Sequence, residues 1–289
     1  MRVINFFNTF QRESKFRYKF NTKRAIYIFQ NQNDIDFIKK EVSEIKSSNI
    51  RLIHGSGIPN IYISNTNKYK KNSPWLKSFK TEKNKISKKI TFVYCARLLK
   101  EKGILIFIEL SKIYPENKFL VFGSIDSSTR DSLTMNDLNF YKKNCLNITF
   151  MNNIKDPLLS IKNNPSILVV PSFYGEGFPR GVVEANTLSM PVISSKDAAE
   201  RIPLKNIVYE SKSNDIKSYI ECINKIIKDY KNNNLSKKLE YARIQAINNF
   251  SEELIVKKTL KIYKSLKFKK NKSYLLTKDK KKLNNWVSQ

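Results

Sequence analysis

A series of short apolar runs, each followed by a helical pattern, is the feature that most limits the folds open to this chain. The predicted strands are Ile90 to Cys95, Lys118 to Phe122, Ile148 to Met151, Ile167 to Val170 and Pro191 to Ser194. Helices are expected between and after them, at residues 103–113, 130–144, 156–162 and 181–188. Because the strands are apolar on both faces, they fit a sheet that helices cover on both sides. The pattern therefore predicts an α/β fold with a doubly wound parallel sheet.

The residues before and after this predicted sheet show other sequence patterns. Residues 25–29 predict a buried strand, 34–47 a helix and 51–53 another strand, whereas the polar, basic residues 65–89 are typical of a linker. After the last central strand, residues 207–209 could add an edge strand. From Asp215 the pattern is mostly helical and ends in a lysine-dense tail.

Length and composition narrow the protein class. A chain of 289 residues with 40% apolar residues can bury a core. The three cysteines, Cys95, Cys145 and Cys222, lie far apart and form no metal-binding spacing, which favours buried thiols in a reducing compartment. The sequence has no apolar run of the length that a membrane span or a signal peptide needs. We therefore expect a cytoplasmic protein without a bound metal.

The net charge of +29 is high for a chain of this length. It favours partners with negative surfaces, such as nucleic acid, anionic lipid or phosphorylated ligands. Lysines are spread along most of the chain, so a general lysine-rich composition explains much of the charge equally well. The sequence has no helix-turn-helix, zinc-finger or aromatic RNA-binding pattern, and we therefore expect no nucleic-acid partner.

Ligands of parallel sheets bind at the carboxyl ends of the strands, and this rule selects residues 96–103, 123–126 and 172–180. In the first segment, Arg97 follows a predicted strand, and Lys102 with Gly103 opens a predicted helix. Two cations beside a helix N-terminus suit a diphosphate. A solvated basic loop would have the same sequence.

The third segment carries two carboxylates in a defined setting. Glu176 lies between Gly175 and Gly177 in a loop after a strand, and Glu184 lies on the helix that follows Pro179. Carboxylates in these positions can accept hydrogen bonds from sugar and ribose hydroxyls. The alternative is a helix-terminal charge and a solvated glutamate.

Together these motifs resemble the retaining GT-B glycosyltransferases of family 4, enzymes with two Rossmann-like domains. The resemblance spans about residues 25 to 265. It rests on FQNQND (29–34), LIHGSGI (52–58), ITFVYCARLLKEKGI (90–104), FLVFGS (119–124) and ILVVPS with GEGFPRGVVEANTLSMPVISS (167–172 and 175–195).

The resemblance implies a role for each residue that matches the family pattern. Glu176, Arg97 and Lys102 would be catalytic, the two cations neutralising the diphosphate of the departing donor and Glu176 holding hydroxyls of the transferred sugar. Gly177 and Phe178 would lie beside the diphosphate and the sugar, and Glu184 would hold the ribose.

The remaining predicted donor-binding residues are Asn152 beside the base, Gly123 and Pro179. The implied donor is a nucleoside diphosphate sugar linked to UDP or GDP, with no cofactor and no metal. The implied acceptor is a surface glycan or a lipid-linked glycan of lipopolysaccharide, capsule or exopolysaccharide assembly.

The N-terminal part departs from the family pattern. Only about 50 residues precede the LIHGSGI segment, so residues 1–60 would be a remnant of the acceptor-side domain, without its glycine-rich loop and catalytic histidine. The one histidine, His54, is interpreted as structural. The missing part would be lost, or supplied by a separate polypeptide. The remaining divisions are a basic linker at 61–89, a nucleotide-sugar-binding domain at 90–250, and a C-terminal helix with a lysine-rich tail at 251–289.

Two alternatives remain at this stage. The chain could transfer sugar, or it could be an inert donor-binding remnant that needs its other half, because transfer requires both reactants in one cleft. The tail, Lys257 to Lys282, could be a solvated helix or could lie on an anionic membrane surface.

Overall fold

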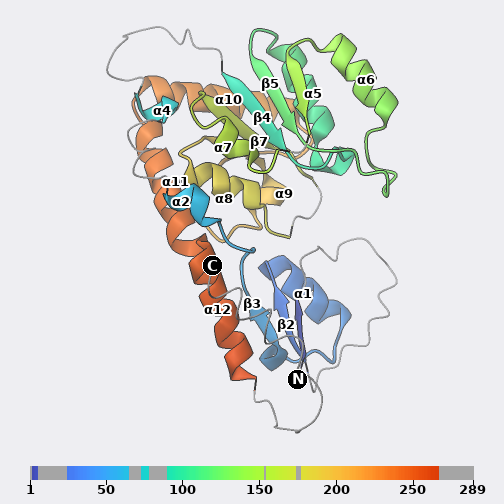
Figure 1. Ribbon diagram of the computed structural model, residues 1–289, viewed down its shortest axis with the longest axis vertical. Coiled ribbons are helices and arrows are strands. Elements are labelled where there is room, and N and C mark those ends of the chain that lie inside the picture. Colours follow the sequence, from blue (N-terminus) through green and yellow to red (C-terminus); the bar gives the residue numbers. More distant parts are fainter. Residues whose placement is uncertain are drawn as a thin grey trace.

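The computed structural model describes residues 2–5, 25–64, 73–77, 90–152, 154–173 and 177–266. Within them the chain forms two parallel sheets, which belong to two domains (Figure 1). We call the part around the six-stranded sheet the larger domain and the part around the three-stranded sheet the smaller domain.

The six-stranded sheet has the order β6-β5-β4-β7-β8-β9. Its strands are β4 Thr91–Cys95, β5 Lys118–Phe122, β6 Ile148–Met151, β7 Ser166–Val170, β8 Val192–Ser195 and β9 Tyr209–Ser211. Every neighbouring pair is parallel. Strands β5 and β6 lie on one side of β4, and the later strands β7, β8 and β9 lie on its other side. The order therefore reverses between β4 and β7, which is the doubly wound arrangement.

Helices cover both faces of this sheet. Residues that alternate along β4 point to opposite sides: Phe92 and Tyr94 belong to one buried cluster and Val93 to the other. The first cluster is covered by α5 Ile104–Ile113, α6 Met135–Asn144 and α10 Ile216–Lys231. The second is covered by α7 Pro157–Ser160 and α8 Arg180–Thr187. Helix α11 Leu235–Phe250 contributes to both, and α9 Lys196–Ala199 follows β8.

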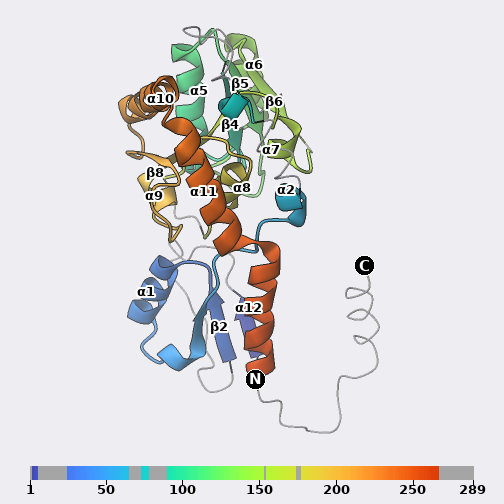
Figure 2. The same cartoon turned by 90° about the vertical axis from the view of Figure 1, so that its left-hand side faces the viewer.

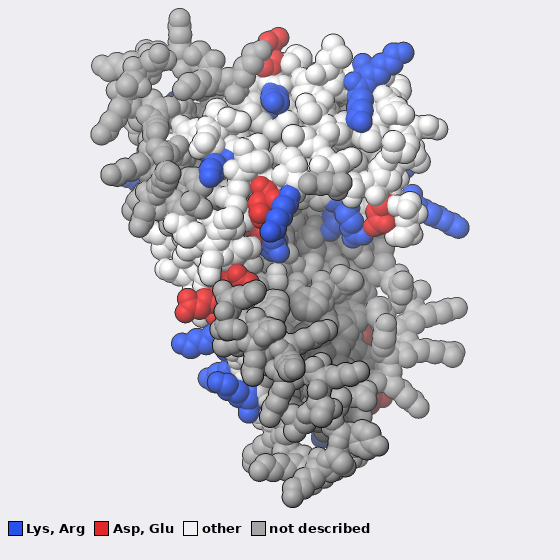
Figure 3. Space-filling view, viewed as in Figure 1, with Lys and Arg blue, Asp and Glu red and all other residues white. Residues whose placement is uncertain are grey.

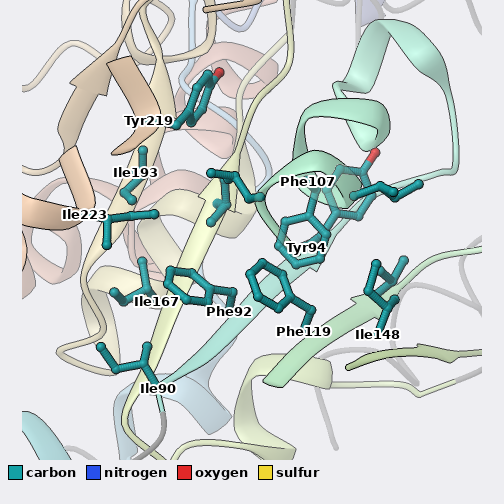
Figure 4. Packing of buried hydrophobic residues seen from close by; sticks show 14 of the residues in the cluster. Ile90, Phe92, Tyr94, Phe107, Phe119, Ile148, Ile167, Ile193, Tyr219 and Ile223 are labelled. Atoms are coloured by element: carbon teal, nitrogen blue, oxygen red, sulfur yellow. The ribbon is translucent and has the colours of Figure 1, made fainter. Parts of the chain in front are cut away.

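Aromatic rings fill the centre of the first cluster, as Figure 4 shows. Phe92 and Phe119, on adjacent strands, stack with ring centroids 4.7 Å apart. Phe107 of α5 meets Phe119 edge-on at 5.2 Å. Offset and edge-on pairs of this kind stabilise a core by about 0.5–1.5 kcal/mol beyond the area that they bury. They fix α5 against the strands and so place its N-terminus at the sheet edge.

The smaller domain is a three-layer unit around strands β1 Arg2–Asn5, β2 Ala25–Phe29 and β3 Ile50–Leu52, in the order β1-β2-β3. Helix α1 Gln32–Glu41 packs on one face, where Tyr27 and Phe29 meet it. Helix α12 Glu252–Ser265 packs on the other, where Ile28 contacts the cluster of Ile255 and Ile262 (Figure 2). The short helix η1 Ser47–Asn49 precedes β3.

Two chain segments cross between the domains side by side. Ile58 N–H donates to Phe250 O at 2.7 Å, and Glu252 N–H donates to Ile58 O at 3.1 Å. The C-terminal helix thus returns to the smaller domain through a hydrogen-bonded junction, which ties the positions of the two sheets together.

The fold class predicted from the sequence is confirmed, and each predicted strand of the larger sheet lies within two residues of its observed bounds. The predicted helix at 34–47 ends early, at Glu41, because Val42 has non-helical dihedral angles. Strand β1 was not predicted. The lysine-rich tail beyond residue 266 lies outside the described residues. Among the described helices, none has the length and apolar character needed to cross a bilayer.

The segment predicted to be a linker holds two short helices, α2 Asn60–Ser64 at its start and α4 Pro74–Lys77. Trp75 of α4 is buried, and its indole N–H donates to Ser166 O at 2.9 Å. This part of the segment therefore packs against β7 of the larger domain.

Candidate active site

The predicted site residues lie at one edge of the larger sheet. Asn152 follows β6, Gly123 follows β5, Arg97 and Lys102 follow β4, and residues 177–184 follow β7. These strands are parallel neighbours, so their carboxyl ends meet at the same edge. The fold brings these residues to one edge, as expected. Glu176 lies outside the described residues, and its predicted role stays a prediction.

The loops after β4 and β5 are packed tightly together. Leu98 N–H donates to Ser124 O at 3.0 Å, and a Cβ added at Gly123 would lie only 2.0 Å from Ala96 O. Only glycine allows this approach of the two backbones. Gly123 N–H also reaches Met151 O at 3.4 Å, which places the start of the Asn152 loop next to it.

Arg97 is exposed at this edge and forms an ion pair. Its Nη1 lies 2.6 Å from Asp126 Oδ2, and 58% of its side chain is accessible. Hydrogen bonds from Ser128 and Arg97 hold the pKa of Asp126 below its usual range. In this structure the guanidinium therefore faces an ionised carboxylate. A diphosphate could replace that carboxylate as the partner of Arg97, because both accept charge-assisted hydrogen bonds.

Lys102 ends the short helix η2 Lys100–Lys102, immediately before α5. Gly103 between them has φ 74°, and a Cβ there would lie 2.2 Å from Pro171 O at the end of β7. The N-cap residue Gly103 gives α5 no side-chain hydrogen bond, so the N–H groups of the first turn of α5 have no capping side chain at this edge of the sheet. Phe173 N–H donates to Glu101 O at 3.1 Å, which joins the loops after β4 and β7.

Glu184 lies on α8 and is buried, with 7% of its surface exposed, so the solvated alternative for it is wrong. Its Oε1 lies 2.5 Å from Arg180 Nε, one turn earlier on the helix. Burial raises the pKa of Glu184, and the charge and hydrogen bond of Arg180 oppose this rise. Arg180 thus helps to keep a carboxylate ionised where burial disfavours the charge.

The surroundings of Glu184 are shielded from water. Burial, with the charge of Glu184 as a second cause, raises the pKa of Cys95 to about 12 and also raises the pKa of Tyr62.

Burial likewise raises the pKa of the Cys222 thiol, on α10, to about 11. All three cysteines are free, and the thiols of Cys95 and Cys222 are protonated and unreactive at neutral pH.

Comparison with known proteins identifies the family. The sequence model described as "Glycosyl transferases group 1" matches residues 77–245, which is more than half of the chain. The chain belongs to this family. An uncharacterized glycosyltransferase of Methanocaldococcus jannaschii is 26% identical over 183 residues, 62% of this chain and 41% of the relative. The chain thus spans about two fifths of that curated relative.

Two solved structures have the same fold at low sequence identity. A glycosyltransferase from Rickettsia africae has a TM-score of 0.69 and 21% identity, with 92% of this chain and 71% of that chain covered. Anabaena Alr3699/HepE, in complex with UDP, has a TM-score of 0.68 and 17% identity, with 91% and 72% covered. These similarities confirm the predicted fold of a group 1 glycosyl transferase.

His54 lies at the junction of the two domains in this group 1 chain. Its ring centroid is 6.3 Å from those of both Phe178 and Phe250. Its Nδ1 lies 3.0 Å from Gln30 O. Because a carbonyl oxygen only accepts, Nδ1 carries the proton, and a neutral ring is the Nδ1–H tautomer. The ring is thus held by packing at the junction.

Sequence reasoning missed the partners that hold the predicted residues. Asp126 pairs with Arg97, Arg180 pairs with Glu184, and the carbonyl of Gly177 is bound by Asn31 of the smaller domain at 2.6 Å. The Arg180–Glu184 spacing of four residues on a helix was a usable signal for an ion pair. The other two contacts join distant parts of the sequence and leave no local pattern.

We predict that His54 titrates below its usual pKa of 6.5, because burial, and secondarily the charge of Lys258, disfavours the imidazolium more than the Gln30 hydrogen bond favours it. As the one histidine of the chain, its ring protons can be followed unambiguously in an NMR pH titration. Protonation favours the unfolded state, so the stability contributed above pH 6.5 is lost as the pH falls through the folded-state pKa.

His54→Gln should therefore lose less stability than the wild type between about pH 7.5 and about pH 5.5 in urea unfolding. An NMR titration midpoint of His54 above pH 6.5 would contradict the lowered pKa. So would an equal pH dependence of stability in His54→Gln and the wild type.

Proposed function

We propose that this chain binds a nucleoside diphosphate sugar, linked to UDP or GDP, and transfers the sugar with retention and without a metal ion. The observation that carries the proposal is the convergence of Arg97, Lys102 and the N-terminus of α5 at the point where the strand order reverses. These groups are suited to neutralise the diphosphate as it leaves. The complex of Anabaena HepE with UDP supports a nucleotide ligand for the shared fold.

Each side chain has a proposed task in this reaction. Arg97 and Lys102 hold the diphosphate and Glu176 holds the transferred sugar. Glu184 holds the ribose, and the ion pair with Arg180 favours its charged form. Gly177, Phe178, Pro179, Gly123 and Asn152 line the donor. The proposed acceptor is a surface or lipid-linked glycan, as in the polysaccharide assembly of family 4 members.

The described charges on one face of the larger domain do not favour nucleic-acid binding as the main function. On the face shown in Figure 3, the described Lys and Arg side chains of the larger domain lie in separate places, some of them beside Asp or Glu. A nucleic-acid site requires a continuous basic strip to follow a phosphate backbone. A donor-binding chain without turnover is a further alternative.

We predict that Arg97→Ala weakens UDP or GDP binding roughly 10- to 100-fold in calorimetry, the effect of losing one charge-assisted contact to phosphate. Arg51→Ala is the matched control, because Arg51 donates hydrogen bonds to Ser48 O and Ile50 O in the smaller domain, away from the edge of the larger sheet.

Glu176→Ala should abolish donor hydrolysis or sugar transfer while UDP binding persists.

Equal losses in Arg97→Ala and Arg51→Ala would refute the assigned diphosphate site. If short oligonucleotides bind the wild type and Arg97→Ala equally well, and UDP and GDP do not bind, the nucleic-acid alternative is favoured. Saturable nucleotide binding without hydrolysis or transfer would support the inert donor-binding chain.

We further propose that α12 contacts an anionic membrane surface at the cytoplasmic face, where a lipid-linked acceptor resides. Val256, Leu260 and Tyr263 are 47%, 51% and 41% exposed and lie on one flank of the helix. They line an open cavity of about 280 Å³, to which Ile28 and Ile53 of the smaller domain also contribute.

Exposed lysines, Lys257, Lys261 and Lys264, lie on the adjacent flank of α12. A helix with an apolar flank beside a cationic one is suited to the boundary between lipid headgroups and acyl chains. Each lysine near an anionic surface contributes about 1 kcal/mol, and this attraction is screened by salt.

We predict that the protein co-sediments with vesicles of phosphatidylglycerol and phosphatidylcholine, less so at high salt, and only weakly with phosphatidylcholine alone. Leu260→Gln should reduce this binding roughly 5- to 10-fold, the effect of losing one partly buried leucine side chain. Leu146→Gln, at a 92% exposed leucine of the larger domain, should leave it unchanged. Equal binding of the two variants would contradict the contribution of α12.

A further inference from the structure

A buried polar cluster joins the smaller domain to the loop that precedes α8. We call Asn31, Asp34, Arg201 and the carbonyl group of Gly177 the clasp. Asn31 and Asp34 begin α1, Arg201 follows α9, and Gly177 ends the predicted donor loop. The three side-chain residues are 1%, 3% and 5% exposed. The clasp therefore links three chain segments in a place that water hardly reaches.

Asn31 uses its whole hydrogen-bonding capacity in the clasp. Its Nδ2 donates to Gly177 O at 2.6 Å and to Asp34 Oδ2 at 2.9 Å. Its Oδ1 accepts from Asp34 N–H at 2.8 Å and from Arg201 Nη1 at 3.1 Å. A side-chain amide has two donor hydrogens and two acceptor lone pairs, so the amide is held in a single orientation.

Arg201 holds the other side of Asn31. Its Nη1 also lies 3.3 Å from Asp34 Oδ1, which makes a buried ion pair between the two domains. The larger domain thus binds the start of α1 through Arg201, and α1 in turn binds the loop of the larger domain through Asn31. The Gly177 carbonyl is held from the smaller domain, although it lies in the same domain as Arg201.

Holding this carbonyl fixes the peptide group that follows it. The described residues contain no cis peptide bond, so the N–H of Phe178 points opposite to Gly177 O and away from Asn31. The Phe178 ring is held too, because it packs 5.0 Å from the ring of Phe250 and 6.3 Å from that of His54. Backbone and ring are both fixed at the point where the predicted donor loop enters α8.

We propose that Asn31 and Arg201 are positioning residues, which hold the Gly177–Phe178 peptide in the orientation that the sugar portion of the donor requires. This inference rests on the proposed function for its ligand, but the positioning itself can be measured without a ligand. Arg97 and Lys102, the proposed diphosphate ligands, lie on a different loop. Loss of the clasp should therefore weaken binding of the sugar far more than binding of the nucleotide.

The test compares Asn31→Ser with Asn49→Ser. Serine still caps α1 but cannot reach Gly177 with an amide donor. Asn49 is the matched control, because it too is a buried asparagine whose Nδ2 donates to a backbone carbonyl, Ala25 O, at 2.6 Å. In ligand-free hydrogen–deuterium exchange, Asn31→Ser should raise exchange in peptides covering residues 172–182 about 10-fold, whereas Asn49→Ser should not.

With UDP and UDP-glucose as probes, Asn31→Ser should keep UDP affinity within about 2-fold and lose roughly 10-fold in affinity for UDP-glucose. Unchanged exchange in residues 172–182, or an equal rise in both variants, would overturn the proposal. So would equal losses for UDP and UDP-glucose. A wild-type protein that binds neither nucleotide probe, nor GDP, would refute the proposed function, and the exchange comparison would still decide whether the clasp positions the loop.

Discussion

The close packing of the loop after β4 against the end of β7 is the contact on which the candidate site depends. Gly103 lies against Pro171 O so closely that no side chain fits, and Phe173 N–H is bound by Glu101 O. From this point α5 leaves for one face of the sheet and α8 for the other. The divergence of the two helices leaves their N-terminal ends and connecting loops at one edge, where a ligand can reach both.

The smaller domain contacts the loops at this edge of the larger sheet. None of its described strands joins the larger sheet, yet Asn31 binds the loop before α8 and His54 packs on Phe178. The paired crossing segments at Ile58 and Phe250 set where it sits. Its contacts at this edge are with Gly177 and Phe178, the residues proposed to lie beside the donor, whereas Arg97 and Lys102 belong to the larger domain.

Much of the larger domain could be predicted from the sequence because its signals are local. A strand such as Lys118–Phe122 is apolar on both faces, and the glycine after it marks its end. The positions of Arg97 and Lys102 followed from the same pattern, since a parallel sheet places its strand ends together. The membership of a glycosyltransferase family followed from several motifs in the right order.

The features that could not be predicted depend on contacts between distant residues. Trp75 looked like part of a polar linker because its partner, Ser166, is 91 residues away. No sequence pattern around Arg201 indicates its ion pair with Asp34, which lies 167 residues earlier. Strand β1 has only four residues and is defined by its pairing with β2, from Arg2 opposite Ala25 to Asn5 opposite Ile28. Such contacts become visible only in the folded chain.

A crystal structure of the chain with UDP bound would test the proposed donor site most directly. We predict density for the diphosphate between Arg97 and Lys102, with Arg97 turned away from Asp126, and density for the ribose beside Glu184. Nucleotide density at any other place, such as the cavity between α12 and the smaller sheet, with the Arg97–Asp126 ion pair unchanged, would contradict it.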